Sequence, residues 1–164
     1  MKIYVKHISF LILALISLAC DAPPVYTDYS EYESTLISPE TKIIEIKTLE
    51  LINVYRTSLG LNQLQHMSVI KSVANKHTTN MIAHGTISHD GFDFRSNYII
   101  HKTNAIAVSE NVAYGYSNAH DMVTAWIAST GHRRNIESNS THFDISIEVD
   151  SMCRWYATNI FIRE

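Results

Sequence analysis

Three residues in this sequence combine side-chain types and surroundings that favour a chemical site. His89, Glu110 and His132 occur in the segments ISHDG, SENVAYG and STGHRRN, each rich in small residues and each expected at a loop or an element end. Loops positioned by a rigid scaffold are where functional residues concentrate. Two imidazoles and one carboxylate also form a ligand set that binds Zn²⁺ and leaves a fourth position open.

The spacing of these residues does not by itself bring them together. The intervals of 21 and 22 residues differ from a local metal motif such as HExxH, whose histidines lie on one helix face. A shared site is therefore a hypothesis that depends on the fold. Among the other histidines, His66, His101 and His120 are expected at the surface. His77 lies on an apolar helix stripe, which predicts a buried side chain hydrogen-bonded to a carbonyl group.

The elements that must position these residues follow from hydrophobic periodicity. Helices are predicted over residues 41–59, 68–84, 93–101 and 118–128. A strand is predicted over residues 106–116. In residues 143–149, apolar and polar residues alternate, which predicts a strand with one face buried and the other in water. With residues 153–162 it should form an antiparallel hairpin. The class is therefore α+β, with helices packed on an antiparallel sheet.

The surroundings of His132 depend on how the helix before it ends. Gly131 is expected to let the chain turn out of that helix, which would place His132 at a helix-to-loop corner. Other polar residues are expected to be structural and to bond backbone groups or tie the first helix to the rest: Asn53, Arg56, Asn111 and Asn135.

The first residues are expected to direct export rather than to join the fold. Residues 1–19 place two lysines before an apolar run that is too short to span a bilayer, which is typical of a signal peptide. The ending Ser-Leu-Ala-Cys resembles a bacterial lipoprotein cleavage site, with Cys20 as the lipidated residue and the membrane as a partner. Alternatively, the protein is secreted and Cys20 is lost, free or paired with Cys153.

Charge is uneven along the chain. Residues 20–40 contain acidic residues and no Lys or Arg, which predicts an acidic tether, although its tyrosines could also pack on the domain. From residue 41 onward, 11 acidic and 11 basic residues balance. Without a basic patch, a nucleic-acid partner is not expected. Residues 41–164 are expected to form the folded domain.

Five segments in a fixed order resemble the bacterial branch of the CAP superfamily, the SCP-like domain of cysteine-rich secretory proteins, antigen 5 and pathogenesis-related proteins. They are LELINVYRTSLGLNQL, ANKHTTNMIAHGTISHDGF, SENVAYGY, TAWIASTGHRRNI and WYATNIF. The resemblance covers about residues 46–162. It implies an α–β–α sandwich with a central antiparallel sheet flanked by helices.

The resemblance also implies a surface cleft lined by two histidines and two glutamates, which binds divalent cations in some family members. His89, Glu110 and His132 match three of these positions. The fourth falls on Ser129 in this sequence, so the full set is absent. His142, in THFD, resembles a histidine segment of eukaryotic members. The predicted ligands are therefore His89, Glu110 and His132, with His142 as a further candidate, for Zn²⁺ or Mg²⁺.

Three functions fit this sequence. We expect a binding module of the cell envelope, lipid-anchored or secreted, that contacts an unknown protein or small-molecule ligand, rather than an enzyme. The second is a metal-dependent, peptidase-like hydrolase with Glu110 as the base, but Glu110 cannot readily be both ligand and base. The third is lipid or sterol binding, which would need an apolar groove.

Overall fold

The computed structural model describes residues 28–164, so the predicted signal peptide, Cys20 and the first part of the acidic segment lie outside the described residues. The elements are, in chain order, α1 (Ser30–Ser34), α2 (Ile43–Ser58), β1 (Gln65–His66), α3 (Ser68–His84), α4 (Phe92–Lys102), β2 (Ala107–Tyr114), α5 (Ala119–Ala128), α6 (Thr130–Ile136), β3 (His142–Val149) and β4 (Trp155–Arg163). None of the helices in this part of the chain combines the length and the apolar character needed to cross a membrane.

The sheet has the strand order β1-β3-β4-β2. β4 pairs antiparallel with β2 and with β3, which confirms the predicted hairpin. β1 was not predicted; its two residues pair parallel with the start of β3. β4 is therefore a central strand and β2 is an edge strand.

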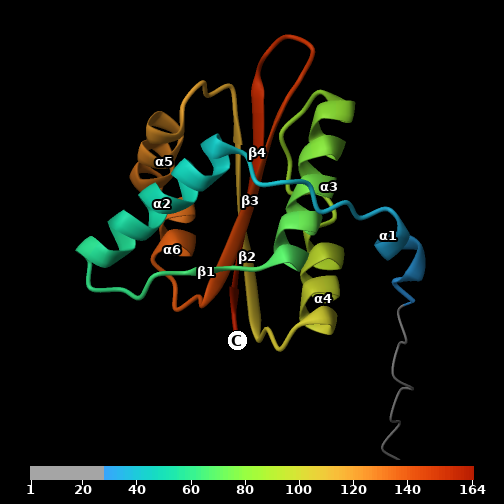
Figure 1. The fold of residues 1–164 in the computed structure, drawn as a ribbon, viewed down its shortest axis with the longest axis horizontal. Helices are drawn as coiled ribbons and strands as arrows, with labels where there is room; N and C mark the ends of the chain where they lie inside the picture. Colours follow the sequence, from blue (N-terminus) through green and yellow to red (C-terminus); the bar gives the residue numbers. More distant parts are fainter. Residues whose placement is uncertain (1–27) are drawn as a thin grey trace, which may run out of the picture.

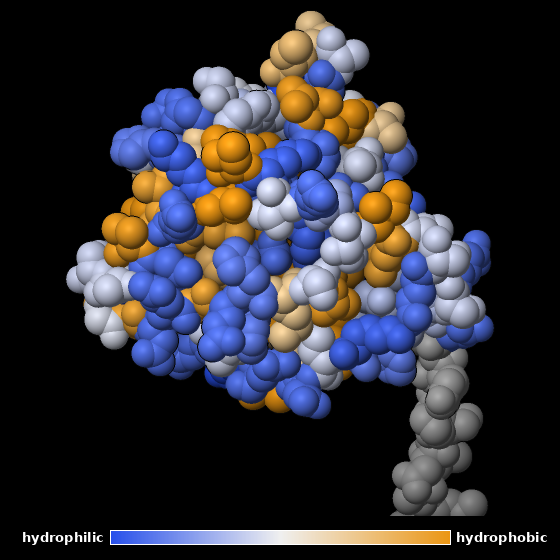
Figure 2. Space-filling model, viewed as in Figure 1, coloured by the Kyte–Doolittle hydropathy of each residue, from blue (hydrophilic) through white to orange (hydrophobic). Residues whose placement is uncertain are grey.

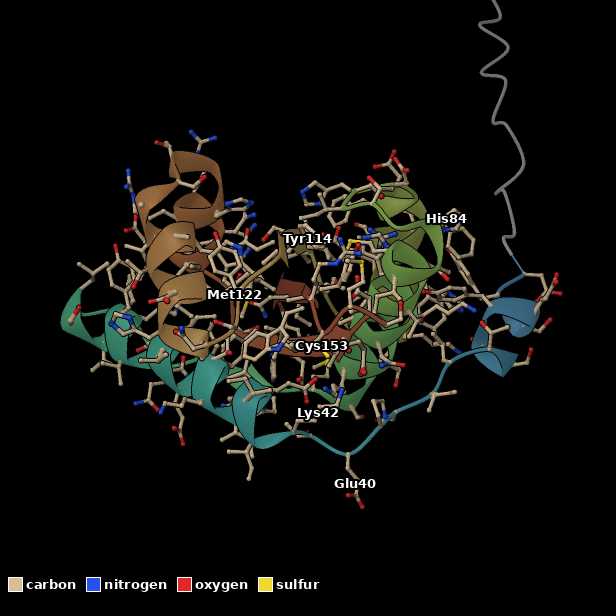
Figure 3. The ribbon with its side chains drawn as sticks, turned by 90° about the horizontal axis from the view of Figure 1, so that it is seen from above. Glu40, Lys42, His84, Tyr114, Met122 and Cys153 are labelled. Atoms are coloured by element: carbon tan, nitrogen blue, oxygen red, sulfur yellow. The ribbon has the colours of Figure 1, made fainter. Side chains whose placement is uncertain are left out.

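Helices cover both faces of the sheet (Figure 1 and Figure 3). Helices α2, α5 and α6 pack on one face, where the core includes Ile52, Trp126 and Ile136. Helices α3 and α4 pack on the other, where Ile70 and Ile99 are fully buried. The α–β–α sandwich implied by the family resemblance is confirmed.

The prediction that one face of β3 meets water is wrong. Asp144 and Ser146, on the polar side of the alternation, are 4% and 0% exposed. α3 covers this face and supplies polar partners: Asn75 donates to the Ser146 hydroxyl at 3.2 Å, and Lys71 donates to the backbone oxygen of Ile145 at 2.8 Å. Polar residues of the strand thus face polar residues of the helix, because a sandwich buries both faces of its sheet.

The described part of the acidic segment packs on the domain through its tyrosines. In α1 and just before it, Tyr32 and Tyr29 contact the ring of Tyr98 with centroids 4.9 and 5.3 Å apart, and Tyr29 also contacts Phe94 at 5.4 Å. Edge-on contacts of this kind stabilise aromatic clusters. Of the two alternatives for these tyrosines, packing on α4 is the one observed.

The β3–β4 hairpin projects beyond the helices (Figure 1), and its tip carries hydrophobic side chains (Figure 2). Met152 and Val149 are 68% and 54% exposed there. Cys153, at the same tip, is also exposed and adopts a positive φ of 59°. A disulfide with Cys20 stays a prediction, since Cys20 lies outside the described residues.

Candidate functional site

The centre of the site is the carboxylate of Glu110, on the edge strand β2. Its side chain is 1% exposed. His89 donates from Nδ1 to its Oε1 at 2.8 Å. Arg95 donates from Nη2 to Oε1 and Oε2 at 2.8 and 2.9 Å, and from Nε to Oε2 at 3.1 Å. Both carboxylate oxygens are therefore occupied from within the protein.

Arg95 explains how a carboxylate can be buried at this position. Burying an unpaired charge is costly, and a guanidinium that bonds both oxygens offsets that cost with two-pronged geometry. Arg95 was missed as a site residue by sequence reasoning. A signal existed: it lies three and four residues before Tyr98 and Ile99, which are buried on the apolar face of α4. A basic residue on an apolar helix stripe needs a buried partner.

His89 presents its other ring nitrogen outward. The residue lies in the connection between α3 and α4, and its side chain is 51% exposed. Nδ1 bonds Glu110, and no residue among 28–164 forms a hydrogen bond with Nε2. A carboxylate on one nitrogen of an imidazole fixes the tautomer and the ring orientation. His89 is thus held rigidly by buried groups with a free nitrogen at the surface.

His132 comes from the opposite helical layer, but not from a helix-to-loop corner. The chain enters a new helix at once, with Ser129 preceding α6, and Gly131 is an ordinary helical residue without positive φ. The prediction of a Gly131 turn is therefore wrong: His132 lies in the first turn of α6. This helix is fixed to β2 by Asn111, which donates to the His132 carbonyl at 3.1 Å.

A second bond fixes α6 to the strand at the site itself. Asn135 donates to the backbone oxygen of Glu110 at 3.1 Å. The prediction that Asn111 and Asn135 bond backbone groups is confirmed. His132 is half-buried, and burial lowers its pKa below 6.5, with the charge of His89 as a further cause. The backbone of His132 is thus held at Asn111, the strand residue next to Glu110.

His77 supports the loop that carries His89. It is buried and its Nε2 lies 2.9 Å from the backbone oxygen of Ser88, which confirms the predicted carbonyl contact. The same nitrogen is 3.8 Å from Oε1 of Glu110. Burial lowers the pKa of His77, and the negative charge of Glu110 opposes that effect. A neutral His77 ties α3 to the residue directly before His89.

The donor set does not fit a three-ligand metal centre. Among residues 28–164, no group of three His, Cys, Asp or Glu is arranged to hold a metal ion. Since Arg95 occupies both oxygens of Glu110, this carboxylate positions His89 instead of offering itself as a ligand. The nitrogen donors that remain are those of His89 and His132. Two imidazoles suit Zn²⁺ better than Mg²⁺, which prefers oxygen ligands.

The fourth predicted candidate is elsewhere. His142 begins β3, and β4 lies between β3 and β2. Its Nδ1 contacts the Thr141 hydroxyl at 3.0 Å and the carboxylate of Glu164 at 3.3 Å. The structure thus joins His89 and Glu110, ties the backbone of His132 to the strand residue next to Glu110, and separates His142. The histidines predicted to lie at the surface are all exposed: His66, His101 and His120.

Comparison with known proteins decides the family. The sequence profile of the cysteine-rich secretory protein family, CAP, matches residues 49–153. This chain belongs to that family. It is 30% identical over 115 residues to the uncharacterized protein YkwD of Bacillus subtilis, an alignment that covers 68% of this chain and 44% of YkwD. The chain therefore spans less than half the length of that relative.

Solved bacterial structures share the fold. An outer surface protein from Borrelia burgdorferi superposes with a TM-score of 0.67 at 19% identity, covering 79% of this chain and 98% of that one. An extracellular SCP-domain protein from Bacillus anthracis gives 0.64 at 23% identity, covering 73% of this chain and 40% of that one. At these identities the likeness establishes the architecture of the CAP domain.

Proposed function

We propose that this CAP domain is a binding module at the outer surface of a bacterial cell, and that its ligand contacts the histidine site, defined as His89, Arg95, Glu110 and His132. Its relatives support the location, since one is described as an outer surface protein and another as extracellular. The predicted signal peptide and lipidated Cys20 agree with that location.

One observation carries the proposal: a buried ion pair holds a half-exposed imidazole. Arg95 and Glu110 are 7% and 1% exposed and satisfy each other without His89. His89 also donates to Glu110, but half of its own side chain, 51%, stays exposed to solvent. An ion pair that served stability alone would not need an imidazole aimed at solvent. A ring fixed on one side and free on the other is suited to ligand contact.

The same geometry disfavours the hydrolase. A general base must reach the proton that it removes. Glu110 is buried, and Arg95 bonds both of its oxygens. Lipid binding is also less favoured. A pocket between α2 and α5, lined in part by Leu51, Val54 and Ile127, has a volume of about 270 Å³, and a pocket of about 360 Å³ beside α2 includes the polar residues Glu50, Gln63 and His66. Pockets for drug-sized ligands run from about 300 to 1,000 Å³.

A calorimetric Zn²⁺ titration tests the proposal, on protein isolated from cells that express the full chain. Zinc is the probe because it binds imidazole nitrogen. We expect saturable binding that is lost in His89→Ala and in His132→Ala. Glu110→Gln should weaken it about 10- to 100-fold, since it removes the carboxylate that orients His89.

His120→Ala is the matched control, because the side chain of His120 is 75% exposed and the residue does not belong to the histidine site. Zinc binding should be unchanged in that variant. Absence of saturable binding, or equal binding in all four variants, would contradict a ligand site built on these two imidazoles. Circular dichroism of each variant separates a lost ligand from a lost fold.

A further inference from the structure

The arginines of residues 28–164 fall into two groups. Four of them donate to a backbone carbonyl or a carboxylate: Arg56, Arg95, Arg133 and Arg154. Arg134 and Arg163 form no side-chain hydrogen bond or ion pair with another described residue. These two come from different elements, α6 and the end of β4. Both nevertheless line the same pocket.

This pocket, called here the arginine pocket, is lined by residues from the start of β2, the end of β4, and α6 with the segment after it. Figure 1 shows where these elements lie. Its volume is about 260 Å³. Val108 and the buried ring of Phe161 form part of an apolar lining. Ser109 and Asn139 add polar side chains that make no hydrogen bond with another residue of the described chain. The pocket therefore combines polar side chains without hydrogen-bond partners in the described chain with an apolar part of its lining.

No carboxylate neutralises the arginine pocket from within, since its lining contains neither Asp nor Glu. The carboxylates next to it in sequence face other partners. Glu137 accepts from the Tyr55 hydroxyl at 2.6 Å, and Glu164 lies 3.3 Å from His142. Neither guanidinium group therefore forms an ion pair with a carboxylate of residues 28–164.

We propose that the arginine pocket binds a small anion, a carboxylate or phosphate group carried on a single ring or a short apolar chain. Guanidinium groups bond the oxygens of both anions in planar, two-pronged fashion. The volume is slightly below the range of about 300 to 1,000 Å³ for drug-sized ligands, which limits the apolar part to a small group.

The arginine pocket shares no lining residue with the histidine site, since His89, Arg95, Glu110 and His132 are all absent from its lining. Ser109 and Glu110 are successive residues of β2, and successive side chains of a strand point to opposite faces. Glu110 bonds Arg95 of α4, whereas Ser109 lies in the pocket beside α6. Although His132 also belongs to α6, binding in the arginine pocket does not require that the histidine site binds anything.

Nuclear magnetic resonance titrations with benzoate, phenyl phosphate and neutral benzamide test this proposal, again on protein from cells expressing the full chain. Saturable shifts in residues 107–109 and 134–140 are expected with one or both anions and not with benzamide. The stronger anion identifies a carboxylate or a phosphate ligand. Arg134→Gln and Arg163→Gln should each weaken binding about tenfold, because each removes charge-assisted hydrogen bonds.

Arg133→Gln is the control, since Arg133 is the adjacent arginine of α6 but donates to the carbonyl of Ile127. Its anion affinity should match the unaltered protein. Both pocket arginines are exposed and unpaired within the described chain, so their replacement should preserve the fold, as circular dichroism can show. Equal binding of benzamide and benzoate, undiminished binding in both pocket variants, or no saturable shifts would each overturn the proposal.

Discussion

Replacement of Arg95 by glutamine should cost much of the stability of this domain. Arg95 makes three donor contacts to Glu110, and the two side chains are 7% and 1% exposed. Removing one partner of a buried ion pair costs about 3–5 kcal/mol, because the other charge stays buried without compensation. Whole domains are stable by only about 5–15 kcal/mol. Arg95→Gln should therefore be among the most damaging single changes at this site.

Urea unfolding at neutral pH measures this cost against two references. Arg133→Gln removes a partly exposed arginine that donates to the Ile127 carbonyl at 3.1 Å and lies 3.9 Å from Glu137, and should cost about 1 kcal/mol. The double variant Arg95→Gln/Glu110→Gln also removes the negative charge of Glu110, which is buried without a partner when Arg95 is replaced. It should be about 2 kcal/mol more stable than Arg95→Gln alone, since two amides can satisfy each other.

Two results would refute this reasoning. A stability of Arg95→Gln within about 1 kcal/mol of that of Arg133→Gln would show that water reaches Glu110 when Arg95 is absent. A double variant no more stable than Arg95→Gln would show that the loss comes from packing and from the Arg95 bond to the Asp90 carbonyl. The uncompensated charge would then not be the cause.

Further predictions concern other buried groups. Burial lowers the pKa of His77 and of His132 below 6.5, so the unfolded chain binds more protons. The contribution of these two groups to the free energy of unfolding should be fully present above pH 6.5 and decrease as the pH falls below it. Urea unfolding at a series of pH values would measure this decrease, which should be smaller in His77→Gln. Burial raises the pKa of Asp144 above 3.8, so Asp144→Asn should raise the urea midpoint at neutral pH and lose that advantage below pH 3.8. Tyr29→Ala should speed hydrogen exchange in α1 while α3 keeps its protection, because Tyr29 is buried against α4.

Elements with strong local patterns could be predicted from sequence. The hairpin of β3 and β4 follows from alternation and a short turn, and α3 runs over the predicted residues, Ser68–His84. The shared face of His77 with apolar residues also predicted its burial. These features depend on neighbours in the chain, so the sequence contains the information for them.

Features that depend on packing between distant segments could not be predicted in the same way. The polar face of β3 is buried because α3 crosses it, about 70 residues earlier in the chain. Gly131 looked like a helix stop, yet α5 already ends before Ser129, and Asn111 and Asn135 bond a second helix, α6, to β2. The role of Glu110 also depends on packing between distant segments. Whether it binds a metal or orients His89 depends on Arg95, which only the fold brings to it.

Arg56 gives a final prediction that links packing to the site. It was predicted to tie the first helix to the rest, and it does: Nη1 donates to the carbonyls of Ile136 and Ser138 at 2.6 and 2.9 Å. Nε donates to the carbonyl of Asn62 at 2.9 Å. Ile136 is the last residue of α6, where helix carbonyls lack partners and favour positive charge, and Ser138 lies two residues beyond it.

Arg56→Lys keeps the charge but cannot reach three carbonyls from one ammonium group with the same geometry. Each buried carbonyl left without a donor costs about 1–3 kcal/mol, so the urea midpoint should fall clearly. If this anchor also fixes the other end of α6, zinc binding at His132 should weaken in parallel. Lost stability with unchanged zinc affinity would show instead that the Asn111 and Asn135 bonds to β2 suffice to position His132.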